Sequence, residues 1–120
     1  MDEAPEQVLS VLRIYGMFNI SSHHRRMTHF VYIMASRPNG AIYIGRTHNL
    51  QSRVQHHRDG RSTHTAKYKI KTLVWFETHD DFDTSLRRER AIKRWRRAWK
   101  NQLIHTANPH WQDITIHIPV

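Results

Sequence analysis

Two short runs of β-branched and aromatic residues form the clearest hydrophobic pattern in the first half of the chain. They cover Phe30 to Ser36 and Ala41 to Arg46, and Arg37-Pro38-Asn39-Gly40 between them supplies turn residues. This pattern predicts a β-hairpin. If the loop has two or four residues, each pair of opposed residues in the hairpin consists of one odd-numbered and one even-numbered residue. Tyr32 and Tyr43 then lie on the same face of the hairpin, because side chains alternate along a strand.

After the hairpin, the apolar positions change to helical spacing. Leu50, Arg53, Val54 and His57 recur at i, i+3, i+4 and i+7, which predicts a helix that begins after the cap residue Asn49. Because the four residues share one helical face, Arg53 and His57 are expected to point inward beside two aliphatic side chains.

The second half of the chain predicts one strand and one long helix. Ile70 to Thr78 is rich in strand-forming residues, and the segment before it, Ser62 to Tyr68, is typical of a loop or a short helical turn. Aspartates that can cap a helix precede Thr84 to Leu103, for which a single helix with an apolar and a basic side is expected. The alternating isoleucines after Trp111 predict a short extended segment or strand.

Charge and composition narrow the function classes. The 120 residues suit one domain, and 19 Lys and Arg against 10 Asp and Glu give a net charge of +9. All of this excess positive charge lies between residues 30 and 113, so it belongs to a folded surface. We therefore expect nucleic acid as the partner, and neither a membrane nor an obligate protein partner. The absence of cysteine excludes disulfides, thiolate metal sites and a cysteine nucleophile, and it favours a cytoplasmic protein, nucleoid association included.

Several short motifs follow one another in a fixed order along most of the chain. They are Val31-Tyr32-Ile33, Tyr43-Ile44-Gly45, Leu50-x-x-Arg53-x-x-x-His57, Thr65-Ala66-Lys67-Tyr68, Leu73-Val74-Trp75-Phe76-Glu77, Arg88-Glu89-Arg90-x-Ile92-Lys93-x-Trp95 and Asn108-Pro109-x-Trp111. Together they resemble the GIY-YIG nuclease superfamily, and within it the small stand-alone bacterial branch. One position departs from the pattern, since Phe30 stands where the first motif opens with glycine.

The resemblance implies an α+β fold, a three-stranded antiparallel sheet flanked by helices, in a nuclease domain at residues 28–113. Residues 1–27 are then an N-terminal extension, and residues 114–120 a C-terminal tail. The extension is open to several interpretations: a segment without a role, a docking helix, a flexible arm, or upstream sequence included by a misplaced start.

The resemblance also assigns residues to a site for divalent-metal-dependent phosphodiester cleavage. Tyr32 and Tyr43 stand for the two motif tyrosines, Arg53 for the catalytic arginine and Glu89 for the carboxylate that holds Mg²⁺ or Mn²⁺. His57 matches a histidine that often follows the arginine. The residues expected to contact the substrate are Arg46, Lys67, Lys93, Arg96, Arg97 and Asn108.

These residue types suit phosphodiester hydrolysis, which needs an activated water and stabilisation of negative charge on the phosphate oxygens. A phenol has a pKa of about 10, and a cationic field with a nearby metal is expected to lower it. Tyr32 or Tyr43 is therefore the general base, and the sequence does not choose between them. The guanidinium of Arg53 can bind two phosphate oxygens, and the lone Glu89 suits Mg²⁺, which keeps much of its water.

Simpler interpretations stand beside this one. Glu89 and Lys93 can form an ordinary ion pair between successive helical turns, Arg53 can pair with Glu77, and His57 can serve helix packing alone. The alternative function is a non-catalytic DNA- or RNA-binding module on the same fold. For the enzyme, DNA is favoured over RNA, with structure-selective or nonspecific cutting in repair, recombination or turnover, because no second recognition domain is evident.

Overall fold

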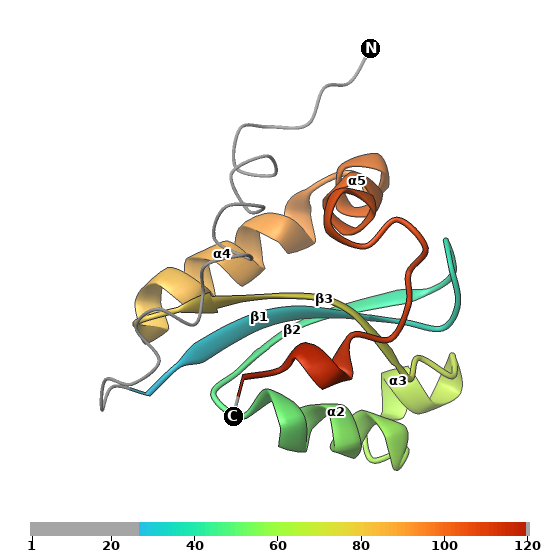
Figure 1. Cartoon of the computed structure of the whole chain (residues 1–120), viewed down its shortest axis with the longest axis horizontal. Helices are drawn as coiled ribbons and strands as arrows, with labels where there is room; N and C mark the ends of the chain where they lie inside the picture. Colours follow the sequence, from blue (N-terminus) through green and yellow to red (C-terminus); the bar gives the residue numbers. More distant parts are fainter. Residues whose placement is uncertain (1–26, 120) are drawn as a thin grey trace.

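A computed structural model describes residues 27–119, so the expected extension at residues 1–27 lies outside the described residues except for Met27. The sheet is antiparallel, with the strand order β2-β1-β3, and this confirms the predicted α+β fold. Helices α4 and α5 cover one face of the sheet, and α2, α3 and η2 lie on the other (Figure 1). In chain order the elements are β1 (His29–Ala35), β2 (Ile42–Thr47), α2 (Leu50–Arg58), α3 (Thr63–Lys67), β3 (Thr72–His79), α4 (Phe82–Arg94), α5 (Arg97–Ala107) and the 3-10 helix η2 (Thr115–His117).

The hairpin has the expected register. Tyr32 pairs with Gly45 and Met34 pairs with Tyr43, so the sums of paired numbers are odd and the two tyrosines share a face. In the connecting loop Asn39 adopts a positive φ of 58°, which asparagine tolerates better than most residues. The local turn chemistry therefore sets the face on which both phenols lie.

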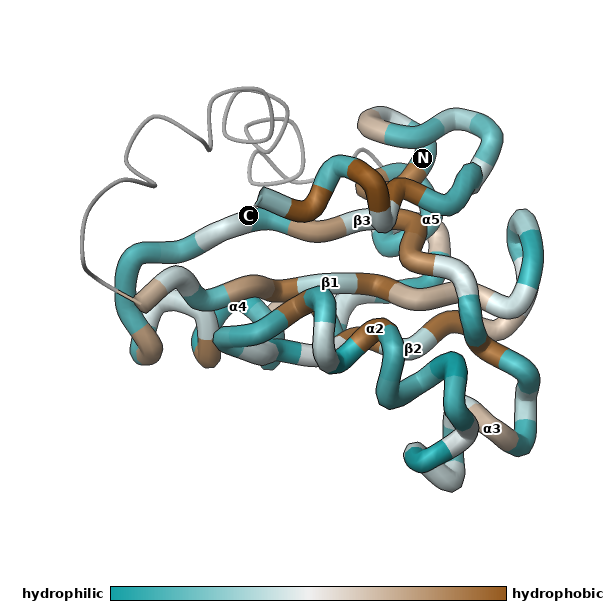
Figure 2. Tube along the Cα trace, turned by 60° about the horizontal axis from the view of Figure 1, so that its bottom comes forward, coloured by the Kyte–Doolittle hydropathy of each residue, from teal (hydrophilic) through white to brown (hydrophobic). Residues whose placement is uncertain are grey.

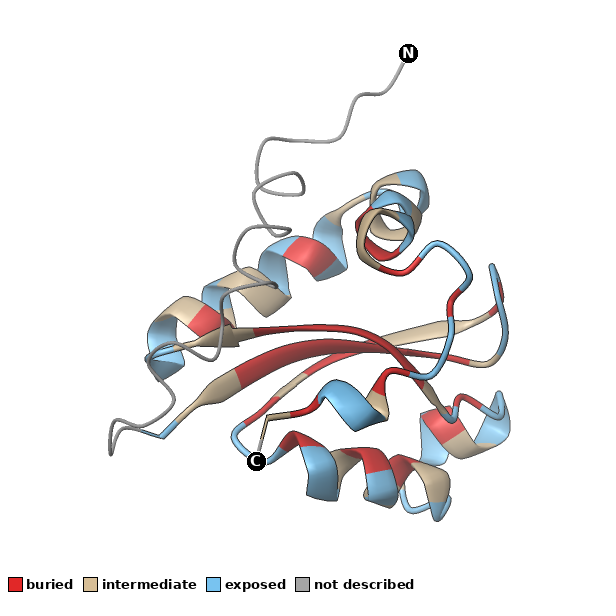
Figure 3. Cartoon of the chain, viewed as in Figure 1, coloured by how far each residue is buried: buried red, intermediate tan, exposed pale blue. Residues whose placement is uncertain are grey.

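Side chains alternate between the two faces of the sheet along β1, and each face has its own hydrophobic core. On the α4 face, Val31 and Ile33 pack with Ile92, Leu103 and Ile104. On the α2 face, the main buried residues are Phe30, Tyr32, Met34, Leu50, Val54, Ile114 and Ile118. The middle strand is buried along nearly its whole length (Figure 3), while α2 is mostly hydrophilic apart from its apolar positions (Figure 2).

The single long helix expected at Thr84 to Leu103 is wrong, because the structure has two helices there. Trp95 and Arg96 between α4 and α5 adopt extended backbone, with ψ of 152° and 157°. The break turns α5 so that Leu103 and Ile104 reach the core, and it leaves Ala98 exposed. None of the helices in the described part of the chain is long and apolar enough to cross a lipid bilayer.

The segment after Trp111 is not extended as expected; residues 115–117 form η2. Ile114 and Ile118 are buried in the core of the α2 face, and the Ile114 N–H donates to the Leu73 carbonyl at 2.9 Å. Arg58 of α2 holds the same segment, with a 2.6 Å ion pair to Asp113 and a 2.9 Å hydrogen bond to the Thr115 hydroxyl. The C-terminal segment thus closes one face of the sheet.

Candidate active site

Tyr32 lies flat across the neighbouring strand, over Gly45. A Cβ atom added at Gly45 would lie 2.6 Å from the Tyr32 Oη and 2.7 Å from its Cζ, far inside contact distance. Only glycine therefore leaves room for the ring. Because β2 is an edge strand, this placement carries the Tyr32 hydroxyl from the middle strand toward the edge of the sheet.

A directed chain of hydrogen bonds starts at this hydroxyl. The Tyr32 Oη lies 2.8 Å from the His57 Nε2, and the His57 Nδ1 lies 3.1 Å from the Thr65 Oγ1. The Thr65 hydroxyl donates to the carbonyl of Ser62, so it accepts from the Nδ1–H of His57. The Nε2 of His57 is then an acceptor, and the Tyr32 hydroxyl donates its proton to it. Burial lowers the pKa of His57 to about 4, which keeps the ring neutral at pH 7.

The second motif tyrosine joins this pair from β2. The ring centroids of Tyr43 and Tyr32 are 6.2 Å apart, and those of Tyr43 and His57 are 5.0 Å apart. Tyr43 is half-buried, whereas Tyr32 is fully buried. The two phenols therefore share a site but differ in access to solvent.

For Tyr32, burial acts against the expected lowering of the phenol pKa. Its burial raises the pKa well above the ordinary value, Tyr43 adds to this effect, and the charge and hydrogen bond of Arg53 oppose it. Desolvation dominates because the anion of a buried phenol loses its hydration. Tyr32 therefore stays protonated, consistent with its role as a donor to His57.

Arg53 and Glu89 complete the group from opposite faces of the sheet. Arg53 of α2 donates a hydrogen bond to the Tyr32 phenol, and the Glu89 carboxylate of α4 is close enough to raise the pKa of that phenol further. Residues from both faces of the sheet can lie near the Tyr32 hydroxyl because this hydroxyl points toward the edge strand β2, against which α4 also packs. We call Tyr32, Tyr43, Arg53, His57 and Glu89 the edge cluster; the structure brings all five together.

The edge cluster offers one carboxylate to a metal. Among residues 27–119, no group of three or more His, Cys, Asp or Glu side chains could enclose an ion. The Glu89 Oε2 forms a 3.0 Å ion pair with Lys93, so the ordinary helical pair foreseen from the sequence is present. The donor set fits a hard cation that takes its other ligands from water and a substrate phosphate, once Lys93 releases this oxygen.

Of the residues expected to contact substrate, Lys67, Lys93 and Arg96 are exposed. The Arg96 guanidinium lies 5.3 Å from the Trp99 ring centroid, at the start of α5. Two others make contacts within the chain. Arg46 bonds to His29 at 3.2 Å and lies over the Phe82 ring, and Arg97 donates to the Gly40 carbonyl of the hairpin loop.

Asn108 does not join the edge cluster. Its side-chain amide donates to the carbonyls of Val74 at 3.0 Å and Gln112 at 2.8 Å, and its oxygen accepts from the Gln112 N–H at 3.1 Å. The side chain is buried, and the backbone occupies both its donor and its acceptor ends. Asn108 therefore fastens the end of α5 to β3, and the predicted substrate contact would require its amide to give up a backbone partner.

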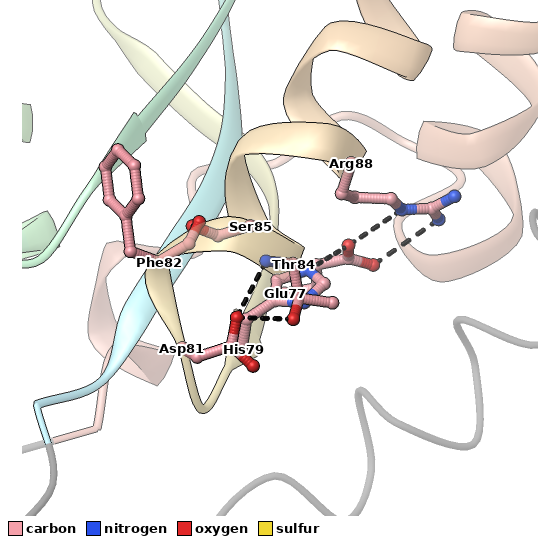
Figure 4. A network of polar contacts seen from close by, with 7 residues as sticks. All are labelled: Glu77, His79, Asp81, Phe82, Thr84, Ser85 and Arg88. Atoms are coloured by element: carbon pink, nitrogen blue, oxygen red, sulfur yellow. Dashed lines mark hydrogen bonds and ion pairs between the residues drawn. The ribbon is translucent and has the colours of Figure 1, made fainter.

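Glu77 is held by α4, not by Arg53, so that alternative pairing is also wrong. The Glu77 Oε2 lies 2.8 Å from the Arg88 Nε and 2.7 Å from the His79 Nε2. Figure 4 shows this buried network beside the Asp81 cap, whose carboxylate accepts from the Thr84 N–H at 2.8 Å. Arg88 directly precedes Glu89, so the network fixes the helix that carries the carboxylate of the edge cluster.

Two contributors were missing from the sequence-based set of site residues. Gly45 was visible as the partner of Tyr32 in the hairpin register, a signal that points to close approach of a ring. Thr65 gave no such signal, since its contact with His57 depends on how the loop after α2 folds back.

Comparison with known proteins identifies the family of the chain. The family model described as the GIY-YIG catalytic domain matches residues 28–102. A structure solved by NMR in solution, that of the UPF0213 protein from Bacillus halodurans, is 26% identical, with a TM-score of 0.46; the match covers 78% of this chain and 100% of that chain. No curated protein matches the chain.

Proposed function

Because the chain belongs to the GIY-YIG catalytic-domain family, we propose that it is a divalent-metal-dependent endonuclease that hydrolyses phosphodiester bonds in nucleic acid. The family supports a nuclease-type function. The observation that carries the finer proposal is the edge cluster: Tyr43, Arg53 and His57 lie around the Tyr32 phenol, and the Glu89 carboxylate is near enough to act on that phenol electrostatically.

In this mechanism Tyr43, in its phenolate form, accepts the proton of the attacking water and becomes the neutral phenol. It is the more accessible phenol, while Tyr32 is buried and already donates its proton to His57. Tyr32 and His57 then act as positioning residues that hold the Tyr43 ring and the Arg53 guanidinium. A general base must lie within hydrogen-bond reach of the proton it takes, and the partly exposed Tyr43 can meet a water that arrives with substrate.

Charge on the phosphate is stabilised by Arg53, whose planar fork keeps donors beyond the one used by Tyr32. Glu89 would hold Mg²⁺ or Mn²⁺, which supplies Lewis-acid stabilisation of the departing 3′ oxygen when bound. Lys93 exchanges its partner in this state, from the Glu89 carboxylate to a substrate phosphate. The neighbouring cations Lys67 and Arg96 provide further phosphate contacts, and Arg46 and Arg97 do so with the donors their internal contacts leave.

We infer DNA as the favoured substrate over RNA, with nonspecific or structure-selective cutting in repair, recombination or turnover, and a place in the cytoplasm. The basis is the net charge of +9, which suits binding to the phosphates of nucleic acid.

A cleavage panel tests the proposal. Single-stranded, duplex and branched DNA and RNA are incubated with Mg²⁺ or Mn²⁺, and wild type is compared with Tyr43→Phe and Glu89→Gln. We expect metal-dependent cutting that falls by at least about 10²-fold in each variant. If no substrate is cleaved and Glu89→Ala has the same properties as wild type, the hypothesis of endonuclease activity is rejected. The Glu89–Lys93 ion pair favours the alternative, a binding module, which the same samples identify by salt-sensitive binding without turnover.

A further inference from the structure

Helix α3 extends the rings of the edge cluster out to the protein surface. The His64 ring centroid lies 6.2 Å from that of Tyr43 and 5.0 Å from that of Tyr68. His64 is exposed, and Tyr68 is 47% exposed despite its size. We call Tyr43, His64 and Tyr68 the aromatic row; it begins at the proposed general base and ends in solvent.

Packing does not account for the outer half of this row. Tyr68 and His64 contribute to neither core, although α3 itself is held by the buried Thr65. Lys67 lies over one side of the Tyr68 ring, and the 47% exposure of Tyr68 leaves the rest of the ring available to a ligand with a flat face.

Cations accompany the aromatic row. The Lys67 Nζ lies 5.4 Å from the Tyr68 ring centroid, and Lys69 follows on an exposed turn. Exposed rings interleaved with ammonium groups match a strand with exposed bases, since the rings stack on bases while the cations meet the phosphates. Duplex DNA offers only its phosphates to such a surface, because its bases are stacked on each other.

We propose that the aromatic row stacks an unpaired nucleobase next to the bond to be cut, so that the protein prefers single-stranded nucleic acid, or a flap or loop, over duplex. The preference for single-stranded substrate in cleavage rests on the proposed endonuclease function. The stacking itself is a property of binding and does not require turnover.

The experiment measures binding of the full chain by fluorescence anisotropy with chelator present, so that no metal-dependent cleavage intervenes. The probes are a labelled single strand of about 12 nucleotides, the corresponding duplex, and a strand of equal length built entirely of abasic sites. The proteins are wild type, Tyr68→Ala and Tyr68→Phe. Ile116→Ala is the matched control, since Ile116 is an 85% exposed apolar residue on η2, outside the row.

We expect Tyr68→Ala to weaken binding of the single strand about tenfold and that of the duplex less than about twofold, with Tyr68→Phe and Ile116→Ala near wild type. On the abasic strand, Tyr68→Ala should have no further effect, because the base that the ring contacts is already absent. Circular dichroism confirms that each variant is folded.

An equal loss on single strand and duplex, or a loss that persists on the abasic strand, overturns the proposal. So does unchanged binding of Tyr68→Ala to the single strand. The cleavage panel is independent of these results: cutting without base stacking refutes the aromatic row alone, and base stacking without cutting refutes the enzyme alone.

Discussion

A methyl group at position 45 would occupy space that the Tyr32 ring fills. We predict that Gly45→Ala lowers the free energy of unfolding by about 1–3 kcal/mol, the range for overpacking, and sharply reduces cleavage, because the Tyr32 hydroxyl must leave His57. Urea denaturation and cleavage rates measure both effects. In a Tyr32→Leu background the added methyl should cost much less stability, and additive losses in that double mutant would contradict the steric explanation.

His57 gives the stability a pH dependence of known sign. Burial lowers its pKa from 6.5 to about 4, so the unfolded chain binds a proton first as the pH falls through this interval. The free energy of unfolding should therefore be highest above about pH 6.5, drop by as much as about 3 kcal/mol toward pH 4, and level off below. Denaturation of wild type and His57→Gln near pH 5 and near pH 7.5 checks this. An equal decrease in both proteins would exclude His57 as the cause.

Residue-level predictions from sequence succeeded where they depended on local periodicity. The alternation of a hairpin placed Tyr32 and Tyr43 on one face, and helical spacing turned Arg53 and His57 inward. The protonation of Tyr32 was outside the reach of the sequence, because it depends on burial, which the packing of α2 and the C-terminal segment determines.

At the scale of elements, Asn108 joins the end of α5 to β3. We predict that Asn108→Ala lowers the free energy of unfolding by about 2–4 kcal/mol, since it leaves the buried Val74 carbonyl and the part-buried backbone groups of Gln112 without this partner. Affinity for nucleic acid, measured well below the melting temperature, should change little. A large loss of affinity in a variant of wild-type stability would restore Asn108 as a substrate contact.

The division between α4 and α5 shows where element prediction fails. The break falls at Trp95 and Arg96, with no glycine or proline to mark it. Local propensity favours continuation, but burial of Leu103 and Ile104 against the sheet favours the turn. The hairpin and α2 were predictable because their determinants are adjacent in sequence.

For the whole molecule, the net charge of +9 dictates how binding responds to salt. Affinity for nucleic acid should fall by at least about tenfold between about 50 and 200 mM monovalent salt. Binding releases counterions from the nucleic acid, and this release is less favourable at higher salt. Lys67→Gln should reduce the slope of log affinity against log salt by about one, if Lys67 contacts a phosphate. A flat salt profile in wild type would argue against phosphate as the main ligand.

The late position of Ile114 and Ile118 bears on how the protein is made. Phe30 and Tyr32 leave the ribosome early, yet their side of the sheet is sealed only when residues more than eighty positions later arrive. Until then the nascent chain presents uncovered apolar surface on that side, a state prone to association with other chains. Tyr32 thus gains its buried environment only after residues 114–118 have been synthesised, which would delay any nuclease activity until that segment has left the ribosome.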